Sequence, residues 1–380
     1  MTTVVLPGGH RHTLRGGPAA PQGAAPSTSR VVYGAAHVVA DPLAENVPGA
    51  PAVLDWDATM AFRHHLWNHG LGVAEAMDTA QRGMGIDYPA VRSLIQRSVL
   101  EARSVGGKVV AGVATDHLAG PATLGEVLDA YRLQLADVIE AGAQPVLMCS
   151  RHLAAVAKSP EDYLHVYSTL LSEVDTPVVL HWLGEMFDPA LTGYWGTSSP
   201  TEAADTVLSL IKDHDKVVDG IKMSLLDKDL EIAFRRRLPA GVRMYTGDDF
   251  NYPELIAGDQ EGYSDALLGV FAVLAPLVGP ALHLLDAGDT AGFRAVLDPT
   301  VPLARHLFGA PTQFYKTGIV FLSWLSGHQS HFTMVGGLQS GRSVTNLARL
   351  LVLADEVGLL PDAELAAMRA RAFFTTCGVS

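Results

Sequence analysis

The sequence predicts an α/β protein, a (β/α)8 TIM barrel with a C-terminal all-helical extension. Between residues 30 and 274, short apolar runs alternate with segments of helical spacing, a pattern typical of parallel strands that are buried on both faces. The runs number eight, which favours a closed barrel over an open doubly wound sheet. No Gly-x-Gly-x-x-Gly turn follows the first run, so nothing indicates a dinucleotide-binding fold.

The chain divides into three regions. Residues 1–29 are rich in glycine, proline, alanine and serine and predict a small hairpin or a tether. The barrel region, residues 30–274, has expected strands at 31–38, 72–77, 108–114, 145–148, 177–182, 217–222, 242–245 and 262–268. Its expected helices lie at 55–69, 88–104, 124–141, 160–174, 200–213 and 229–238. Strand periodicity then stops, and residues 275–380 predict a helical region.

Composition limits the classes of partner. Hydrophobic residues make up 48 % and charged residues 18 % of the chain, as in ordinary globular proteins. A formal net charge of -13 argues against nucleic acid, which requires basic patches. Cys149 and Cys377 are too few for a disulfide framework and fit a reducing cytoplasm. No signal peptide or membrane-spanning run is recognisable, so we expect a cytoplasmic protein that acts on a small molecule without binding a membrane.

The most informative residue is Lys222, which ends the apolar run at 217–222. In a β/α barrel the carboxyl ends of the strands form the active-site face. An amine held there is partly desolvated, which lowers its pKa and leaves some of it neutral. The neutral amine can attack a carbonyl carbon and form a Schiff base, although lysines at strand ends are also common without any catalytic role.

The other strand endings are also polar, and in a barrel they converge on one face. Together they supply the candidate substrate-binding residues Asp78, Thr79, Asp116, His117, Arg151, His152, Trp182, Glu185, Ser224, Asp248 and Asp249. In one mechanism Lys222 forms an imine and His181, on the neighbouring strand, shuttles protons. In the alternative, a divalent metal is bound by histidines and carboxylates of the same ring, namely His117, His152, His181 and Glu185, with Asp116.

Two further segments have no assigned role. Residues 185–199 are too long for a plain βα loop and too aromatic for a solvated one, so they predict either a lid or a packed insertion. Residues 327–342 form a polar, glycine-rich stretch between two expected helices, which either covers a site or oligomer contact or merely connects the helices.

The motif Gly220-Ile221-Lys222-x-Ser224, followed by Asp227 and by Tyr245-Thr246-Gly247-Asp248-Asp249, resembles the strand-six and strand-seven signature of the dihydrodipicolinate synthase and N-acetylneuraminate lyase superfamily. Residues 141–143 and 175–180 also match, and the resemblance covers roughly residues 30–325. It implies a (β/α)8 barrel with a helical C-terminal region and class I Schiff-base chemistry at Lys222. It also implies a homo-oligomer, a dimer or tetramer.

The chain resembles a divergent branch of this superfamily. The superfamily's Gly-Thr-Thr-Gly-Glu motif binds the carboxylate of a 2-keto acid, whereas this chain has Met77-Asp78-Thr79-Ala80-Gln81. Asp78 would repel a carboxylate. His181 stands where the superfamily has a proton-relaying tyrosine, and histidine can do the same work near neutral pH. The substrate expected is therefore a hydroxyl-rich carbonyl compound, such as a keto-sugar or keto-inositol.

These residues predict a Schiff-base-forming lyase or aldolase that needs no cofactor. The first alternative is a metal-dependent sugar isomerase, epimerase or hydrolase that uses the ring of histidines and carboxylates. The second alternative is a barrel that binds a sugar without turning it over.

Overall fold

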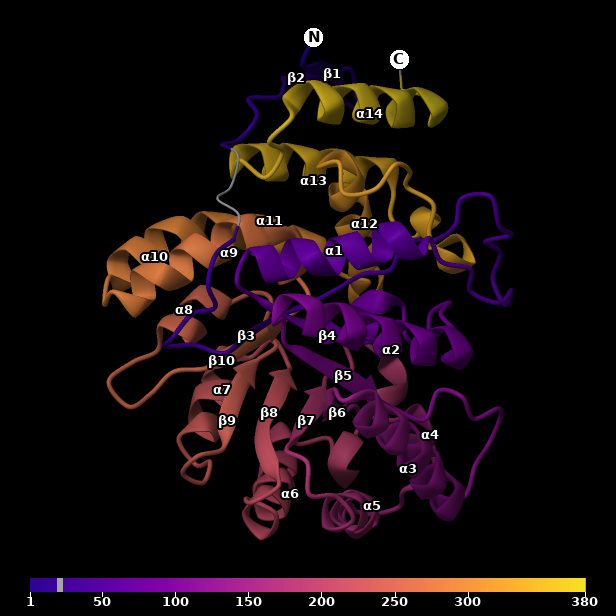
Figure 1. Cartoon of the computed structure of the whole chain (residues 1–380), viewed down its shortest axis with the longest axis vertical. Coiled ribbons are helices and arrows are strands. Elements are labelled where there is room, and N and C mark those ends of the chain that lie inside the picture. The colour runs from indigo at the N-terminus through magenta and orange to yellow at the C-terminus, as the bar shows by residue number, and fades with distance from the viewer. Residues whose placement is uncertain (19–22, 380) are drawn as a thin grey trace.

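The computed structural model describes residues 1–18 and 23–379 (Figure 1). Residues 19–22, part of the expected tether, and Ser380 lie outside the described residues. The parallel strands close into a barrel in the order β10-β3-β4-β5-β6-β7-β8-β9. They are β3 (Val32–Ala35), β4 (Gly72–Glu75), β5 (Val109–Val113), β6 (Gln144–Leu147), β7 (Val178–Leu183), β8 (Val218–Ser224), β9 (Arg243–Thr246) and β10 (Asp265–Leu268). The predicted fold class is confirmed.

Helices cover the outside of the barrel between successive strands. They are α1 (Trp56–Asn68), α2 (Tyr88–Val105), α3 (Leu124–Ala141), α4 (Arg151–Val156), α5 (Pro160–Ser172), α6 (Pro200–Asp213), α7 (Lys228–Arg235) and α8 (Tyr252–Ala257). Side chains cap most of their first turns; at α3, Thr123 and Glu126 form a reciprocal capping box. The short helices α4 and α8 were not among the expected elements, because each has only 6 residues and follows a polar strand ending directly.

The interior of the barrel is apolar below the level of Lys222. A separate cluster of buried side chains fills it, namely Tyr33, Ala35, Ala74, Met77, Val110, Ala114, Val146, Met148, Val179, Tyr245 and Leu267. In the sheet register Lys222 lies beside His181 on β7 and beside Tyr245 on β9. The cluster therefore closes the barrel beneath the amine, and a ligand can reach Lys222 only from the carboxyl ends of the strands.

The C-terminal region is helical, as predicted. It contains α9 (Phe271–Asp286), α10 (Thr290–Leu297), α11 (Val301–Leu307), α12 (Tyr315–Leu325), α13 (Val344–Glu356) and α14 (Ala363–Thr376). The expected boundary at residue 274 falls inside α9, because Pro276 and Pro280 lie within that helix and hide its start in the sequence pattern. No helix in the described part of the chain is long and apolar enough to cross a membrane.

The two ends of the chain pack together at the top of the molecule (Figure 1). The strands β1 (Thr3–Val5) and β2 (Arg11–Thr13) form the expected small hairpin. Arg371 on α14 donates hydrogen bonds to the carbonyls of Met1 and Thr3, at 2.8 and 3.1 Å. The buried carboxylate of Asp355 binds His12 at 2.9 Å. These bonds tie the hairpin to the C-terminal helices.

Candidate active site

A narrow pocket opens at the carboxyl ends of the strands around the amine of Lys222. About 280 Å³ of space not filled by atoms lies within it, part of which is open to solvent. Its lining is Ala35, Met77, Asp78, Thr79, Leu183, Phe187, Lys222, Ser224, Asp249, Gly269, Phe308 and Tyr315. We call it the inner pocket. It brings together five of the residues predicted from the sequence, namely Asp78, Thr79, Lys222, Ser224 and Asp249.

The close approach of β8 and β9 fixes the position of Lys222. A Cβ atom at Gly247 would lie 2.1 Å from Ser224 Oγ and 2.9 Å from Lys222 Cε. Only glycine leaves room for both side chains, because contacts this short are not found for real Cβ atoms. The backbone after β9 thus forms one wall of the space that the lysine occupies.

The environment of Lys222 favours a partly neutral amine. Only 7 % of the residue is exposed, and burial lowers the pKa of its amine, while the carboxylates of Asp78 and Asp249 oppose this effect. Burial raises the pKa of Asp249 to about 7, although the N–H of Val270, which donates to its Oδ1 at 2.9 Å, and the charge of Lys222 both act in the opposite direction. The pocket therefore holds an amine with a lowered pKa beside a carboxyl group with a raised one, a combination typical of functional sites.

His181 reaches the inner pocket indirectly. It is 1 % exposed and does not line the pocket, but its Nε2 lies 3.2 Å from Ser224 Oγ, which does. Its Nδ1 has no hydrogen-bond partner among the described residues. Burial, and then the charge of Lys222, hold the pKa of His181 well below its usual range, so the ring is neutral. Ser224 is the link through which this imidazole can exchange protons with the pocket.

A pair of hydroxyl groups forms the opposite wall. Thr79 Oγ1 and Tyr315 Oη lie 2.8 Å apart, and both residues line the inner pocket. Tyr315 stacks on Phe308 with ring centroids 4.3 Å apart. Burial and then the charge of Asp78 raise the pKa of Tyr315 well above its usual value, so its phenol stays protonated. No sequence pattern indicated Tyr315, because it lies in the C-terminal region, far along the chain from the strand endings.

A wider outer pocket adjoins the inner one, and Asp78 and Leu183 line both. It encloses about 960 Å³ of empty space and is open to solvent. The predicted residues Asp116, Arg151 and His152 lie here. Five other residues of its lining that can form polar contacts were not predicted, namely Arg82, Thr115, Cys149, Ser150 and Asp188. Arg82 follows the same polar strand ending as Asp78, and this position in the sequence could have identified it as a candidate site residue.

Four charged side chains of the outer pocket form two ion pairs, and Asp78 is a further acid in its lining. Arg82 Nε lies 2.7 Å from one carboxylate oxygen of Asp116, and Arg151 Nε lies 2.5 Å from Asp188 Oδ2. Burial alone would raise the pKa of Asp116, but Arg82 outweighs it and lowers the value. The pocket therefore offers hydrogen-bonding groups without a free cation that would attract an anionic ligand.

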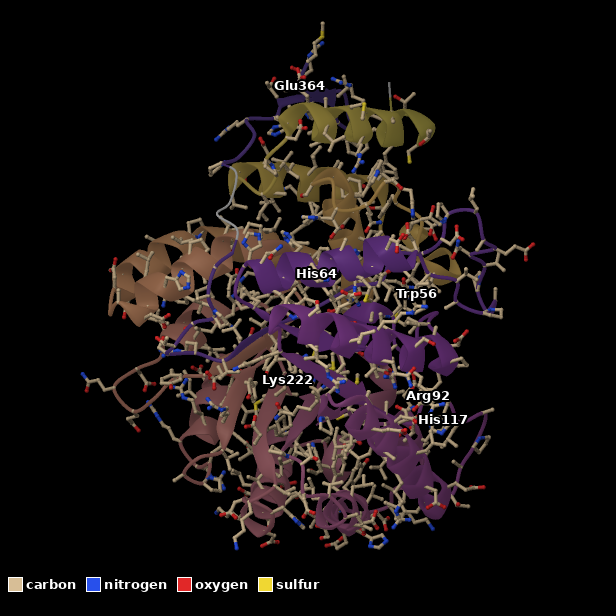
Figure 2. All side chains as sticks on the ribbon, viewed as in Figure 1. Trp56, His64, Arg92, His117, Lys222 and Glu364 are labelled. Carbon is tan, nitrogen blue, oxygen red and sulfur yellow. The ribbon has the colours of Figure 1, made fainter. Side chains whose placement is uncertain are left out.

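Besides His181, four of the predicted residues lie outside both pockets. His117 lies on the flank of the barrel, away from Lys222 (Figure 2), with its Nδ1 2.8 Å from Gln134 Nε2. Trp182 is buried and packs edge to face against Phe234. Glu185 is exposed. Asp248 accepts hydrogen bonds from the backbone of Phe250 and Asn251 and holds the turn after β9.

The ring of metal ligands considered above is not assembled. Across residues 1–18 and 23–379, no group of three or more histidine, cysteine, aspartate or glutamate residues is arranged to hold a metal ion. His152 binds Thr115 at 3.0 Å, while His117 and Glu185 point elsewhere. The geometry gives the metal-dependent alternative no support.

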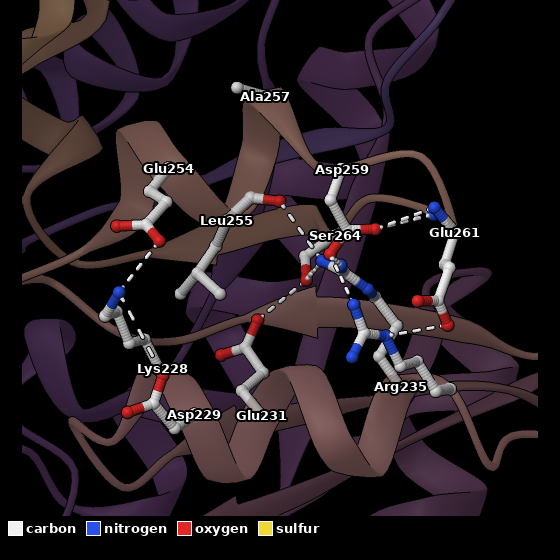
Figure 3. A network of polar contacts seen from close by, with 12 residues as sticks. Lys228, Asp229, Glu231, Arg235, Glu254, Leu255, Ala257, Asp259, Glu261 and Ser264 are labelled. Atoms are coloured by element: carbon white, nitrogen blue, oxygen red, sulfur yellow. Dashed lines mark hydrogen bonds and ion pairs between the residues drawn. The ribbon is translucent and has the colours of Figure 1, made fainter.

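A buried polar network holds the end of β9 in place. Glu231 on α7 accepts hydrogen bonds from Ser264 at 2.7 Å (Figure 3) and from Thr246 at 3.0 Å. The hydroxyl of Thr246 in turn accepts the N–H of Asp248 at 3.1 Å. Burial raises the pKa of Glu231 to about 8. The network fixes the backbone next to Asp249, which lines the inner pocket.

The two unassigned segments have mainly packing contacts. In 185–199, Tyr194 and Trp195 are buried against α5, whereas Phe187 lines the inner pocket. The insertion is therefore partly packed and partly a wall of the site. In 327–342, the carbonyl of Val335 accepts a hydrogen bond from Gln81 Nε2 at 2.8 Å. That segment supports the turn after Asp78 from behind and lines neither pocket.

Comparison with solved structures identifies relatives of this fold. Dihydrodipicolinate synthase from Aquifex aeolicus has a TM-score of 0.65 at 16 % identity, covering 87 % of this chain and 99 % of that one. The enzyme from Thermotoga maritima gives 0.65 at 15 %, covering 87 % and 99 %. The chloride-inhibited enzyme from Acinetobacter baumannii, complexed with pyruvate, gives 0.65 at 14 %, covering 87 % and 100 %. At these identities the similarity establishes the fold alone. The fold that the superfamily resemblance implies is therefore confirmed.

The sequence comparisons give the family. A search of curated proteins found no match. A family model described as "Protein of unknown function (DUF993)" matches residues 8–379. The chain therefore belongs to the DUF993 family, whose member described here has the fold of the dihydrodipicolinate synthase superfamily.

Proposed function

We propose that this protein is a Schiff-base-forming lyase or aldolase and that Lys222 is its nucleophile. The observation that carries the proposal is the burial of the Lys222 amine between Asp78 and Asp249, with a lowered pKa, at the base of a pocket open only at the carboxyl ends of the strands. A neutral amine is the reactive form, and burial, which lowers the pKa of the amine, increases its share.

The inner pocket supplies the proton transfers that imine chemistry requires. The amine adds to the carbonyl carbon, and the resulting carbinolamine must lose its oxygen as water after receiving a proton. Asp249, with a pKa of about 7, can donate that proton and later accept one from the carbon next to the imine. The Thr79–Tyr315 hydroxyl pair and His181, acting through Ser224, provide two further routes on other walls.

The charges of the inner pocket favour an uncharged substrate. Lys222 is the only basic side chain in its lining, and it becomes part of the imine, whereas Asp78 and Asp249 are both acids. A ligand carboxylate would face these two groups without a cation to bind it. Hydroxyl groups, by contrast, can donate to the carboxylates and accept from the hydroxyls of Thr79 and Tyr315. A small hydroxylated ketone therefore suits this pocket better than a 2-keto acid.

The outer pocket suits the second part of the substrate. Its arginines are paired with acids, so it can exchange hydrogen bonds with a polyhydroxylated chain but gives no net attraction to an anion. Because Asp78 and Leu183 line both pockets, a chain bound in the outer one reaches the carbon atoms next to Lys222. The two together accommodate a keto-sugar or a keto-inositol whose carbonyl end occupies the inner pocket.

The proposal is tested by trapping the imine with borohydride. The protein is incubated with dihydroxyacetone, with pyruvate or with a ketohexose, and the adduct is reduced and weighed by intact-mass spectrometry. We expect the hydroxylated ketones to give a single adduct and pyruvate to give less. Efficient trapping of pyruvate alone would refute the proposed substrate class, and the absence of adducts with all ketones would refute the imine.

Turnover requires its own measurement. Release of an aldehyde from ketohexoses that form the adduct distinguishes a lyase from a barrel that only binds sugar. The homo-oligomer expected from the resemblance stays a prediction, which light scattering on the purified protein can check.

A further inference from the structure

A second pocket lies on the flank of the barrel, outside the site around Lys222. Residues of α1, α9 and α12 line it together with Pro18, Ser326, His328 and the turn at 358–361 between α13 and α14. Figure 1 shows α1 and α9 next to each other above the barrel, with α12 and α13 over them. The pocket encloses about 810 Å³ of empty space and shares no residue with either pocket at the strand ends. We call it the flank pocket.

The flank pocket is uncharged. Among the described residues of its lining there is no aspartate, glutamate, lysine or arginine, and the polar side chains are three imidazoles and two serines. The rings of His65 and His328 lie 4.1 Å apart and those of His65 and His69 4.7 Å apart. Burial, and then the neighbouring imidazoles, lower the pKa of His65 to about 2 and that of His328 to about 4. At neutral pH the rings of His65 and His328 are therefore neutral and flat, and each has both a donor and an acceptor nitrogen.

Two groups in the lining have unused hydrogen-bonding capacity. Ser323 is 1 % exposed, and its hydroxyl has no partner among the described residues. Pro276 has no N–H, so the carbonyl of Ala272 lacks the donor that a regular helix would give it. Ala272 and Pro276 both line the flank pocket. Buried polar groups without partners are uncommon in proteins, and a bound molecule can supply the missing hydrogen bond.

We propose that the flank pocket binds an uncharged small molecule with a flat aromatic ring and a hydroxyl group, a ligand of the phenol type. The ring packs between the imidazoles and the apolar side chains of Val273, Leu322 and Leu359. The hydroxyl accepts a hydrogen bond from Ser323 and donates one to the carbonyl of Ala272 or to an imidazole nitrogen. A charged ligand is disfavoured because the lining has no group of opposite charge to offset its desolvation.

The test uses the full chain with ¹³C-labelled histidine side chains, followed by NMR during titration with phenol. We expect shifts confined to the signals of His65, His69 and His328. Benzoate, which has the same ring and a negative charge, should bind more weakly by about tenfold or more, a difference of about 1.4 kcal/mol. Equal binding of benzoate and phenol, or shifts at His181 or His152 instead, would overturn the proposal.

Two variants locate the site. Val273→Phe fills the pocket and should abolish the phenol shifts, whereas Val53→Phe, at a position 44 % exposed and outside the lining, should leave them unchanged. Ser323→Ala changes the volume very little and should weaken phenol by about fivefold, the value of one hydrogen bond. Undiminished binding by both Val273→Phe and Ser323→Ala would rule out this pocket. If phenol caused no shift and the three histidines bound Zn²⁺ instead, the proposal would be overturned in favour of a metal ion.

Discussion

Replacing Lys316 by methionine should stabilise the protein at neutral pH. Lys316 lies on α12 and is 2 % exposed. Its amine has the sulfur of Met84 at 3.2 Å as a hydrogen-bond partner, and no carboxylate forms an ion pair with it among the described residues. Burial, opposed chiefly by Asp78, lowers its pKa from 10.5 to about 8. Burying this ammonium ion therefore lowers the free energy of unfolding of the protein.

The size of the effect follows from the pKa difference. The gap between 10.5 and about 8, at about 1.4 kcal/mol for each pH unit, corresponds to about 3 kcal/mol at pH 7. Because the pKa is lower in the folded state, the unfolded protein binds more protons between pH 8 and pH 10.5, and the natural protein becomes more stable as the pH rises through this window. The advantage of Lys316→Met should be largest below pH 8 and should vanish near pH 10.5.

Urea unfolding followed by circular dichroism measures this difference across that pH range. Lys212→Met, at an exposed position on α6, is the matched control and should change the free energy of unfolding very little. A Lys316→Met variant that is less stable than the natural protein at pH 7, or whose gain does not depend on pH, would contradict this description of the buried amine.

Three further variants test the site. Gly247→Ala should slow imine trapping severely without unfolding the protein, because the new Cβ would displace Lys222. Gly125→Ala is the control and should not slow trapping, because its Cβ would meet no atom within 4 Å. Equal trapping rates for the two variants would contradict the steric argument. Asp249→Asn removes a charge that raises the pKa of Lys222, so the acid limb of the pH profile of trapping should move to lower pH. An unchanged profile would show that Asp249 does not influence the pKa of Lys222. Arg151→Met should weaken ketohexose binding yet leave the trapping of dihydroxyacetone unchanged; a similar loss with both ketones would show that the outer pocket has no separate role.

The barrel could be predicted because its signal is periodic and local. Each strand is an apolar run, and most helices around the barrel have a capped start, as at Asp55 before α1 and Asp227 before α7. The start of α9 was missed because prolines within a helix resemble a boundary.

Strand endings predicted half of the candidate site for a simple geometrical reason. Side chains alternate between the two faces of a strand, so His181 points toward the barrel axis, while Trp182 next to it packs outward against Phe234. The sequence shows where a strand ends but not which of the last residues faces inward, so Asp248 and Asp249 could not be distinguished. Tyr315 could not be predicted from the sequence, because only tertiary packing brings α12 beside Thr79.

The most direct test of the central claim is the position of the borohydride adduct, determined by peptide mass spectrometry. The chain contains its own control, since Lys222 and Lys316 are both buried lysines with a lowered pKa, but only Lys222 lines the inner pocket. We predict that the mass increment of a hydroxylated ketone lies on Lys222, persists in Lys316→Met and disappears in Lys222→Ala. An adduct on another lysine, or trapping undiminished in Lys222→Ala, would contradict the proposed mechanism.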